Sequence, residues 1–174
     1  DINKLLACST VSQLGLMIAG LLMFNAVAIR GVLIFYVAHA LGAGSLFLCA
    51  GIAEKVFGTR NIKQMGGLMK DMPVVTYGFL IGMFSIIGIP PLPGSFGKME
   101  IITGMLGDRQ VLLAFFAMLT TVLTLIYLFR LFLHVFMGEN RKSVIEERIG
   151  FKPMFISVAI LATVSILLGI AMVM

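Results

Sequence analysis

The chain has 174 residues, of which 60% are hydrophobic and 12% are charged, with a formal net charge of +5. Soluble domains carry about 25% charged residues, so this composition excludes an ordinary water-soluble domain. The apolar residues fall in runs of roughly 20, the length that crosses ~30 Å of hydrocarbon. The chain is therefore expected to be an all-α integral membrane protein.

Five apolar segments follow one another, and together they predict a single transmembrane region over residues 1–174. We expect spans at 5–24, 31–56, 72–107, 111–137 and 154–174. If each segment crosses once, nine basic residues fall on the side of the N-terminus and two on the other. The nine are Lys4, Lys55, Arg60, Lys63, Lys70, Arg141, Lys142, Arg148 and Lys152, and the two are Arg30 and Arg109. This asymmetry predicts a cytoplasmic N-terminus in a cell membrane. Because the basic residues flank membrane segments, they do not indicate a nucleic-acid partner.

The first predicted span carries the polar residues Ser9, Thr10, Ser12 and Gln13. Such side chains either line a hydrated path or form hydrogen bonds between helices. We favour interhelical bonding and keep Ser12 as a secondary candidate for an ion path.

The second span contains His39 near its middle, with Tyr36 as a further titratable group. Imidazole suits proton relay because one nitrogen accepts a proton while the other donates one. The alternative is that His39 forms a structural hydrogen bond to a neighbouring helix. The small residues at 42–45 predict a close approach of another helix.

The third span is interrupted by the sequence "GIPPLPGSFGKMEIITG" at residues 88–104. Proline removes a backbone donor and disfavours helical angles in the preceding residue, so Pro90, Pro91, Pro93 and Gly94 predict a broken helix. Backbone left unpaired at membrane depth is tolerated only against protein or a water-filled cavity, and broken helices form ion sites in transporters. The alternative is a short loop outside the membrane between two separate spans. The segment after the break is too short and too charged to span alone.

Two charged residues follow this break, Lys98 and Glu100. We place Lys98 in the first turn of the second half-helix, where the helix dipole and partial desolvation both favour release of its proton. Ionisable residues inside a membrane indicate a functional site; the alternative is that Lys98 extends to the membrane surface. Glu100 points to a different face and is a secondary candidate.

Arg130 and His134 lie four residues apart in the fourth span, near its expected cytoplasmic end. A positioning role is preferred for both, and His134 is kept as a secondary candidate. The sequence has no cysteine cluster for an iron–sulfur centre and no nucleotide-binding loop. We therefore expect neither a cofactor nor a metal site, and no catalysis by this chain alone.

The order of motifs resembles one family of membrane proteins. The motifs are "DINKLLACSTVSQLGLMIAG", "AHALGAGSLFLCAG", "GTRNIKQMGGLMKDMP" and "GIPPLPGSFGKMEII". They are similar to the C-terminal part of the antiporter-like subunits of respiratory complex I and Mrp-type Na⁺/H⁺ antiporters, and of related membrane-bound hydrogenases and sulfur reductases. In that family Lys98 falls on the charged position of a broken helix, and His39 on the central histidine of the helix before it.

The resemblance implies an ion-translocating subunit within a redox-driven or antiporter complex. It would move H⁺, with or without coupling to Na⁺, among other membrane subunits and lipid. The alternative is a scaffold subunit that keeps the fold but does not pump. Ala43 stands where some relatives have lysine, so a relay there would need water or another group. Because the first half of the family fold is absent, we expect either part of a longer subunit or a split or shortened paralogue.

Overall fold

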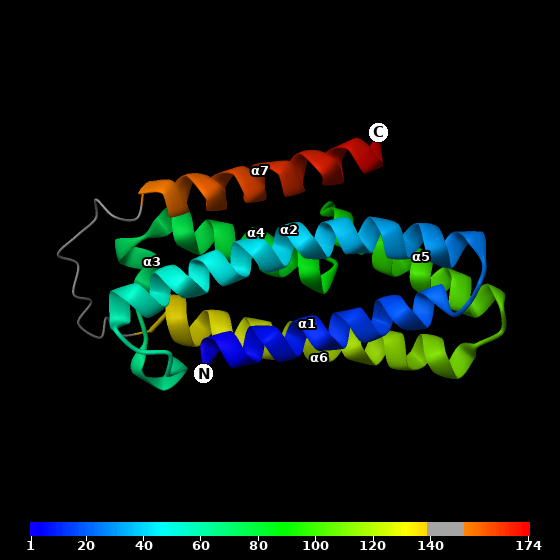
Figure 1. Cartoon of the computed structure of the whole chain (residues 1–174), viewed down its shortest axis with the longest axis horizontal. Coiled ribbons are helices and arrows are strands. Elements are labelled where there is room, and N and C mark those ends of the chain that lie inside the picture. Colours follow the sequence, from blue (N-terminus) through cyan, green and yellow to red (C-terminus); the bar gives the residue numbers. More distant parts are fainter. Residues whose placement is uncertain (139–151) are drawn as a thin grey trace.

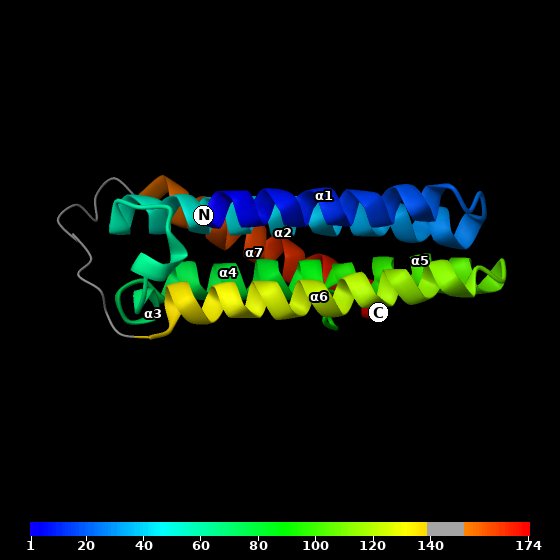
Figure 2. The ribbon, with the colours of Figure 1, turned by 90° about the horizontal axis from the view of Figure 1, so that it is seen from below.

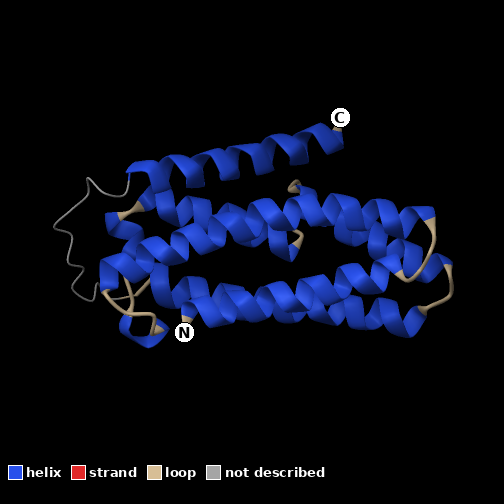
Figure 3. Ribbon diagram, in the orientation of Figure 1, coloured by secondary structure: helices blue, strands red, loops and turns tan. Residues whose placement is uncertain are grey.

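The computed structural model describes residues 1–138 and 152–174, which form helices and contain no strand (Figure 1, Figure 3). The elements are α1 (Ile2–Leu21), α2 (Ala26–Phe57), the 3₁₀ helix η1 (Ile62–Gln64), α3 (Leu68–Asp71), α4 (Pro73–Ile87), α5 (Pro93–Gly107), α6 (Val111–Phe136) and α7 (Lys152–Val173). The expected all-helical membrane fold is confirmed.

The long helices run side by side along one direction (Figure 1). Seen from below, α1 and α2 form one layer and α4, α5 and α6 form another (Figure 2). Helix α7 packs against α2 and α4, on the side away from α1 and α6. Helix α2 contacts both α4 and α5, so it is the element against which the two half-helices are aligned.

Within the described residues, four helices, α1, α2, α6 and α7, are long and apolar enough to cross a membrane. Helices α4 and α5 have 15 residues each, and at ~1.5 Å per residue each is about 22 Å long. Neither alone matches a hydrocarbon core of ~30 Å. Because they follow one another along α2 (Figure 1), the pair makes one further crossing.

Helix α2 begins at Ala26, earlier than the expected start at residue 31. The reason is Asn25, whose side-chain oxygen accepts a hydrogen bond from the Ala28 N–H at 2.7 Å and thereby caps the helix. This cap extends α2 outward by more than a turn. Arg30, which we expected in the connecting loop, is therefore a helical residue.

Small residues bring the central helices into backbone contact. A Cβ atom added at Gly97 of α5 would lie 2.6 Å from the Phe35 backbone nitrogen of α2. One added at Gly42 of α2 would lie 2.9 Å from the Gly82 carbonyl oxygen of α4. These separations are too short for any side chain, so both half-helices lie directly on α2. The close approach predicted around residues 42–45 is found with α4.

The start of α1, the end of α2, η1 and α3 lie at one end of the bundle, and the α1–α2 and α5–α6 turns lie at the other (Figure 1). The basic residues in these described segments are therefore divided between the two ends, as expected if each apolar segment crosses the membrane once. Arg141, Lys142 and Arg148 lie outside the described residues. The side of the membrane that each end faces stays a prediction.

Candidate functional site

The interruption of the third span lies in the middle of the bundle, where Figure 3 draws loop between two helical stretches. Helix α4 ends at Ile87 and is capped by Gly88, which has a φ of +92° and donates its N–H to the Phe84 oxygen at 3.0 Å. Helix α5 begins at Pro93. The predicted broken helix is confirmed, but the break occupies residues 88–92, so Pro93 and Gly94 are helical. Proline is well suited to a first helical turn, which needs no N–H donor there.

The break is partly covered by protein: Leu92 is buried, whereas Pro90 and Pro91 are exposed on the surface of the described residues. A Cβ atom at Gly94 would lie 1.8 Å from the Ser85 carbonyl oxygen, so the start of α5 presses against the end of α4. On the other side, a Cβ atom at Gly169 of α7 would lie 2.2 Å from the Pro91 carbonyl oxygen. Glycine is therefore required at both contacts. Non-helical backbone at membrane depth is tolerated against protein or a water-filled cavity, and these two contacts supply the protein part of that cover.

Lys98 lies inside the bundle and is only 4% exposed. Its Nζ donates a hydrogen bond to the carbonyl oxygen of Ile87, the last residue of α4, at 3.3 Å. The same Nζ lies 5.0 Å from the centroid of the Phe35 ring. An ammonium group has three N–H donors, and Ile87 provides the one acceptor seen among the described residues. The remaining donors are available to water or to another group.

The expected position of Lys98 in the first turn of the second half-helix is wrong. Because α5 starts at Pro93, Lys98 falls in the second turn, beyond the reach of the N-terminal dipole. The nearest helix end is instead the C-terminus of α4, which presents the Ile87 carbonyl. A helix C-terminus carries partial negative charge and favours a cation.

His39 is also buried, at 6% exposed. Neither ring nitrogen has a hydrogen-bond partner among the described residues. Its ring centroid lies 5.9 Å from that of Phe35, the same ring that faces the Lys98 amine. The two candidate residues therefore meet around one aromatic side chain. Buried polar groups are almost always paired, so the imidazole has capacity to bind a group that lies outside this chain, such as water.

Two buried serines extend this polar region, and sequence reasoning missed both. Ser85 Oγ donates to the Ala38 carbonyl oxygen at 3.5 Å, next to His39. Ser165 Oγ of α7 donates to Ser85 Oγ at 3.4 Å. A lone serine in an apolar run carries no specific signal, although Ser85 stands just before the predicted break.

Three secondary candidates are not brought to Lys98 and His39. Glu100 forms an ion pair with Arg30, in which Nε donates to Oε2 at 2.9 Å. Tyr36 is 61% exposed, because with 3.6 residues per turn the buried Phe35 leaves its neighbour on the outer side of α2. Ser12 is exposed on α1.

Ser9 and Gln13 of α1 bond to α6, as the interhelical interpretation predicted, whereas Thr10 Oγ1 donates within α1 to the Leu6 carbonyl oxygen at 3.1 Å. Gln13 Nε2 donates to Thr124 Oγ1 at 2.9 Å, and the hydroxyl groups of Ser9 and Tyr127 share a hydrogen bond. These bonds join α1 to α6, and the exposed Ser12 lies outside this contact.

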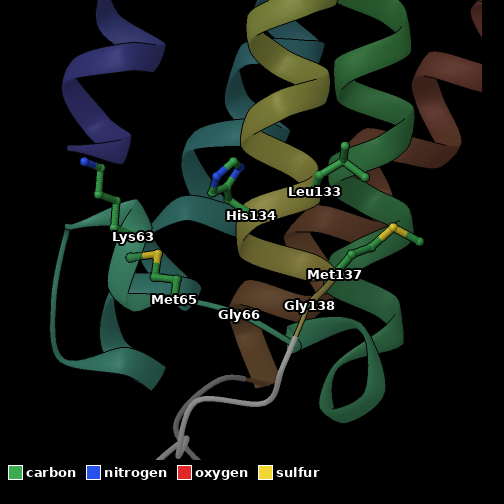
Figure 4. A pocket seen from close by; sticks show the side chains of 7 residues that line it. All are labelled: Lys63, Met65, Gly66, Leu133, His134, Met137 and Gly138. Atoms are coloured by element: carbon green, nitrogen blue, oxygen red, sulfur yellow. The ribbon is translucent and has the colours of Figure 1, made fainter.

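His134 lies at the far end of α6, and its Nδ1 is 2.8 Å from the Arg130 carbonyl oxygen. Its ring and the Lys63 side chain both line a cavity of about 340 Å³ (Figure 4). The other lining residues are Met65, Gly66, Leu133, Met137 and Gly138. This cavity contains neither Lys98 nor His39, so His134 belongs to a separate region. In residues 1–138 and 152–174 no group of three metal-ligating side chains comes together.

The chain is similar to known membrane proteins. The profile of the family described as "NADH:quinone oxidoreductase/Mrp antiporter, TM" matches residues 1–124. A Na⁺/H⁺ antiporter subunit of Alkalihalophilus pseudofirmus is 32% identical over 98% of this chain and 35% of its own length. An NADH-quinone oxidoreductase subunit of Rickettsia prowazekii is 30% identical, with the same coverage of both chains. The chain thus spans about a third of these curated relatives.

A solved structure shares the fold. A chain of the Mrp complex from Dietzia sp. superposes with a TM-score of 0.85, at 23% identity, over 95% of this chain and 39% of that one. At this identity the likeness concerns the arrangement of helices.

Proposed function

We propose that this chain, which belongs to the NADH:quinone oxidoreductase/Mrp antiporter membrane family, moves protons through the buried site at its broken helix. Lys98 is the proton-carrying residue in this proposal, and His39 is the relay that exchanges protons with it. The observation that carries the proposal is the buried Lys98 amine, which is bonded to the Ile87 carbonyl where the helix is interrupted.

The chemistry needs a group that holds a proton in one state and releases it in the next. Protonated Lys98 has the Ile87 carbonyl and the Phe35 ring as neighbours, and both favour an ammonium group. On release, the proton passes to water or to an unprotonated nitrogen of His39, and a neutral amine remains. Because both His39 nitrogens lack partners among the described residues, one can accept as the other donates.

Other membrane subunits and lipid are the proposed partners. The similar proteins are named as subunits of antiporters and of quinone oxidoreductases, and this chain spans about a third of their length. Further helices would then complete the path on either side of Lys98 and His39. Some relatives are named Na⁺/H⁺ antiporter subunits, so coupling of proton movement to Na⁺ is tested as well. The alternative function is a scaffold that keeps the fold without transport.

The test is proton movement in membrane vesicles containing the complete protein, assembled with its partners. Lys98→Met keeps the apolar stem and removes the titratable group, so proton translocation is expected to fall by about tenfold or more with assembly unchanged. Lys4→Met, at an exposed position on α1, is the matched control and should transport normally. Measurement with and without Na⁺ shows whether the two ions are coupled. Normal pumping by Lys98→Met would support the scaffold instead.

A further inference from the structure

Helix α5 carries Lys98, but the break at residues 88–92 separates it from α4. Helical continuity therefore does not fix where α5 sits along the bundle. Its interface with α2 consists of small residues in close contact. A Cβ atom at Gly31 would lie 2.7 Å from the Ile101 backbone nitrogen, and one at Gly104 would lie 2.7 Å from Ala28 Cβ. Glycine and alanine bring the two backbones together but have no hydrogen-bonding group in their own side chains to set the register.

Two polar contacts cross this same interface. Arg30 of α2 binds Glu100 of α5 through two bonds, Nε to Oε2 at 2.9 Å and Nη2 to Oε1. Nearer the end of the bundle, Asn25 Nδ2 donates to the Gly104 carbonyl oxygen at 3.1 Å and to Asp108 Oδ2. The Arg30 contact is the bidentate one, and the planar guanidinium fork fixes both distance and direction.

We infer that Arg30 is a positioning residue: through Glu100 it sets the register of α5 on α2, and thereby the reach of the Lys98 amine to α4. Glu100 is two residues from Lys98 in the same helix, so both move together. A slip of one residue moves α5 by ~1.5 Å. The 3.3 Å contact between Lys98 Nζ and the Ile87 oxygen lies near the upper limit for a hydrogen bond and would not survive that slip.

This inference gives Glu100 a role other than proton carriage. Both of its carboxylate oxygens accept bonds from Arg30, and the side chain lies away from Lys98 and His39. The expected effect of Glu100 on transport rests on the proposed function of Lys98. The expected effect of Glu100 on the position of residue 98 does not rest on it, so transport and position can be measured separately.

The experiment uses the complete protein in its membrane assembly, with Cys8→Ser and Cys49→Ala as background. Lys98→Cys supplies a thiol whose rate of labelling by a membrane-permeable maleimide reports how well residue 98 is enclosed. Arg30→Gln and Glu100→Gln are each expected to raise this rate several-fold. The reversed pair, Arg30→Glu with Glu100→Arg, should restore it. Arg60→Gln is the matched control, because it breaks the 2.7 Å ion pair between Arg60, in the loop after α2, and Glu54 of α2, a pair that does not involve α5.

With Lys98 in place, the same variants are measured for the pH profile of proton translocation. The single variants should alter the profile and the reversed pair should recover it. If labelling rises in the single variants and recovers in the reversed pair while transport stays normal in all of them, the positioning role is supported and the proposed function of Lys98 is contradicted. Unchanged labelling in both single variants would overturn the inference. So would a loss of transport in Glu100→Gln that the reversed pair does not repair.

If the glutamine variants fail to assemble, Arg30→Lys decides the question. It keeps the charge but loses the two-bond geometry, so labelling at residue 98 should rise to an intermediate rate. Labelling equal to that of the parent would contradict the positioning role.

Discussion

Phe35 connects the two residues on which the proposed function depends. Its ring faces the Lys98 amine and lies beside the His39 ring. A buried polar group without a partner costs about 1–3 kcal/mol, and His39 leaves two such nitrogens among the described residues. A purely structural histidine would be expected to use at least one of them. This favours exchange with a mobile partner over a fixed hydrogen bond.

Replacing His39 separates these two roles. His39→Ala removes both nitrogens, and His39→Gln restores hydrogen bonding without a group that titrates near neutral pH. If His39 is a relay, both variants should reduce proton translocation by about tenfold or more, within the range that proton-transfer groups contribute, with assembly intact. Vesicle transport together with the yield of assembled complex is the measurement. Full transport by His39→Gln, with assembly lost in His39→Ala, would make the residue structural.

Sequence reasoning selected Lys98 and His39 as candidates because a charge or an imidazole inside an apolar span is rare. It did not find Phe35, Ser85 or Ser165, because aromatic and hydroxyl side chains are common in such spans. Their importance comes from neighbours on other helices. The Arg30–Glu100 pair was also missed, because Arg30 was assigned to a loop rather than to α2.

The broken helix depends on glycines at contacts between elements, and these contacts explain why its exact limits were not predicted. Proline positions alone indicated a break at residues 90–94. Whether a given proline ends one helix or begins the next depends on the surrounding packing. Gly94 is buried against the end of α4, and this contact keeps it inside α5. The existence of the break was predictable from the sequence, but the residues at which it begins and ends were not.

Gly97→Ala tests the contact between α2 and α5. The added methyl group would meet the Phe35 backbone nitrogen at 2.6 Å, and backbone cannot yield without moving a helix. A destabilisation of about 1–3 kcal/mol is expected, as for other overpacked sites, together with reduced transport because Lys98 is adjacent. Thermal unfolding of the purified complex is the measurement.

Gly107→Ala, in the last turn of the same helix, is its control. No atom lies within 4 Å of a Cβ placed there, so the helix should be unchanged or slightly more stable. Equal unfolding temperatures for Gly97→Ala and the parent would show that α5 does not lie against α2 as described.

At the scale of the whole molecule, more of the basic residues in the described part of the chain lie at the end formed by η1 and α3 than at the end formed by the α5–α6 turn. This arrangement predicts that the loop after α2 faces the cytoplasm and that the turn between α5 and α6 faces the other side. Thiols introduced by Thr59→Cys and by Arg109→Cys, in a background without Cys8 and Cys49, test the orientation in right-side-out vesicles. An impermeant maleimide should label the second site directly and the first only after permeabilisation. The reverse pattern would contradict the assigned orientation.

The central claim is that Lys98 carries protons, and it is tested most directly by comparing Lys98→Arg with Lys98→Glu. Guanidinium stays protonated and cannot release a proton, whereas a desolvated carboxyl group can titrate near neutral pH. In proton-pumping assays on the reconstituted complex, Lys98→Arg is expected to be nearly inactive and Lys98→Glu to retain part of the activity. Normal pumping by Lys98→Arg would show that a fixed positive charge is sufficient at this position and would contradict proton transfer through Lys98.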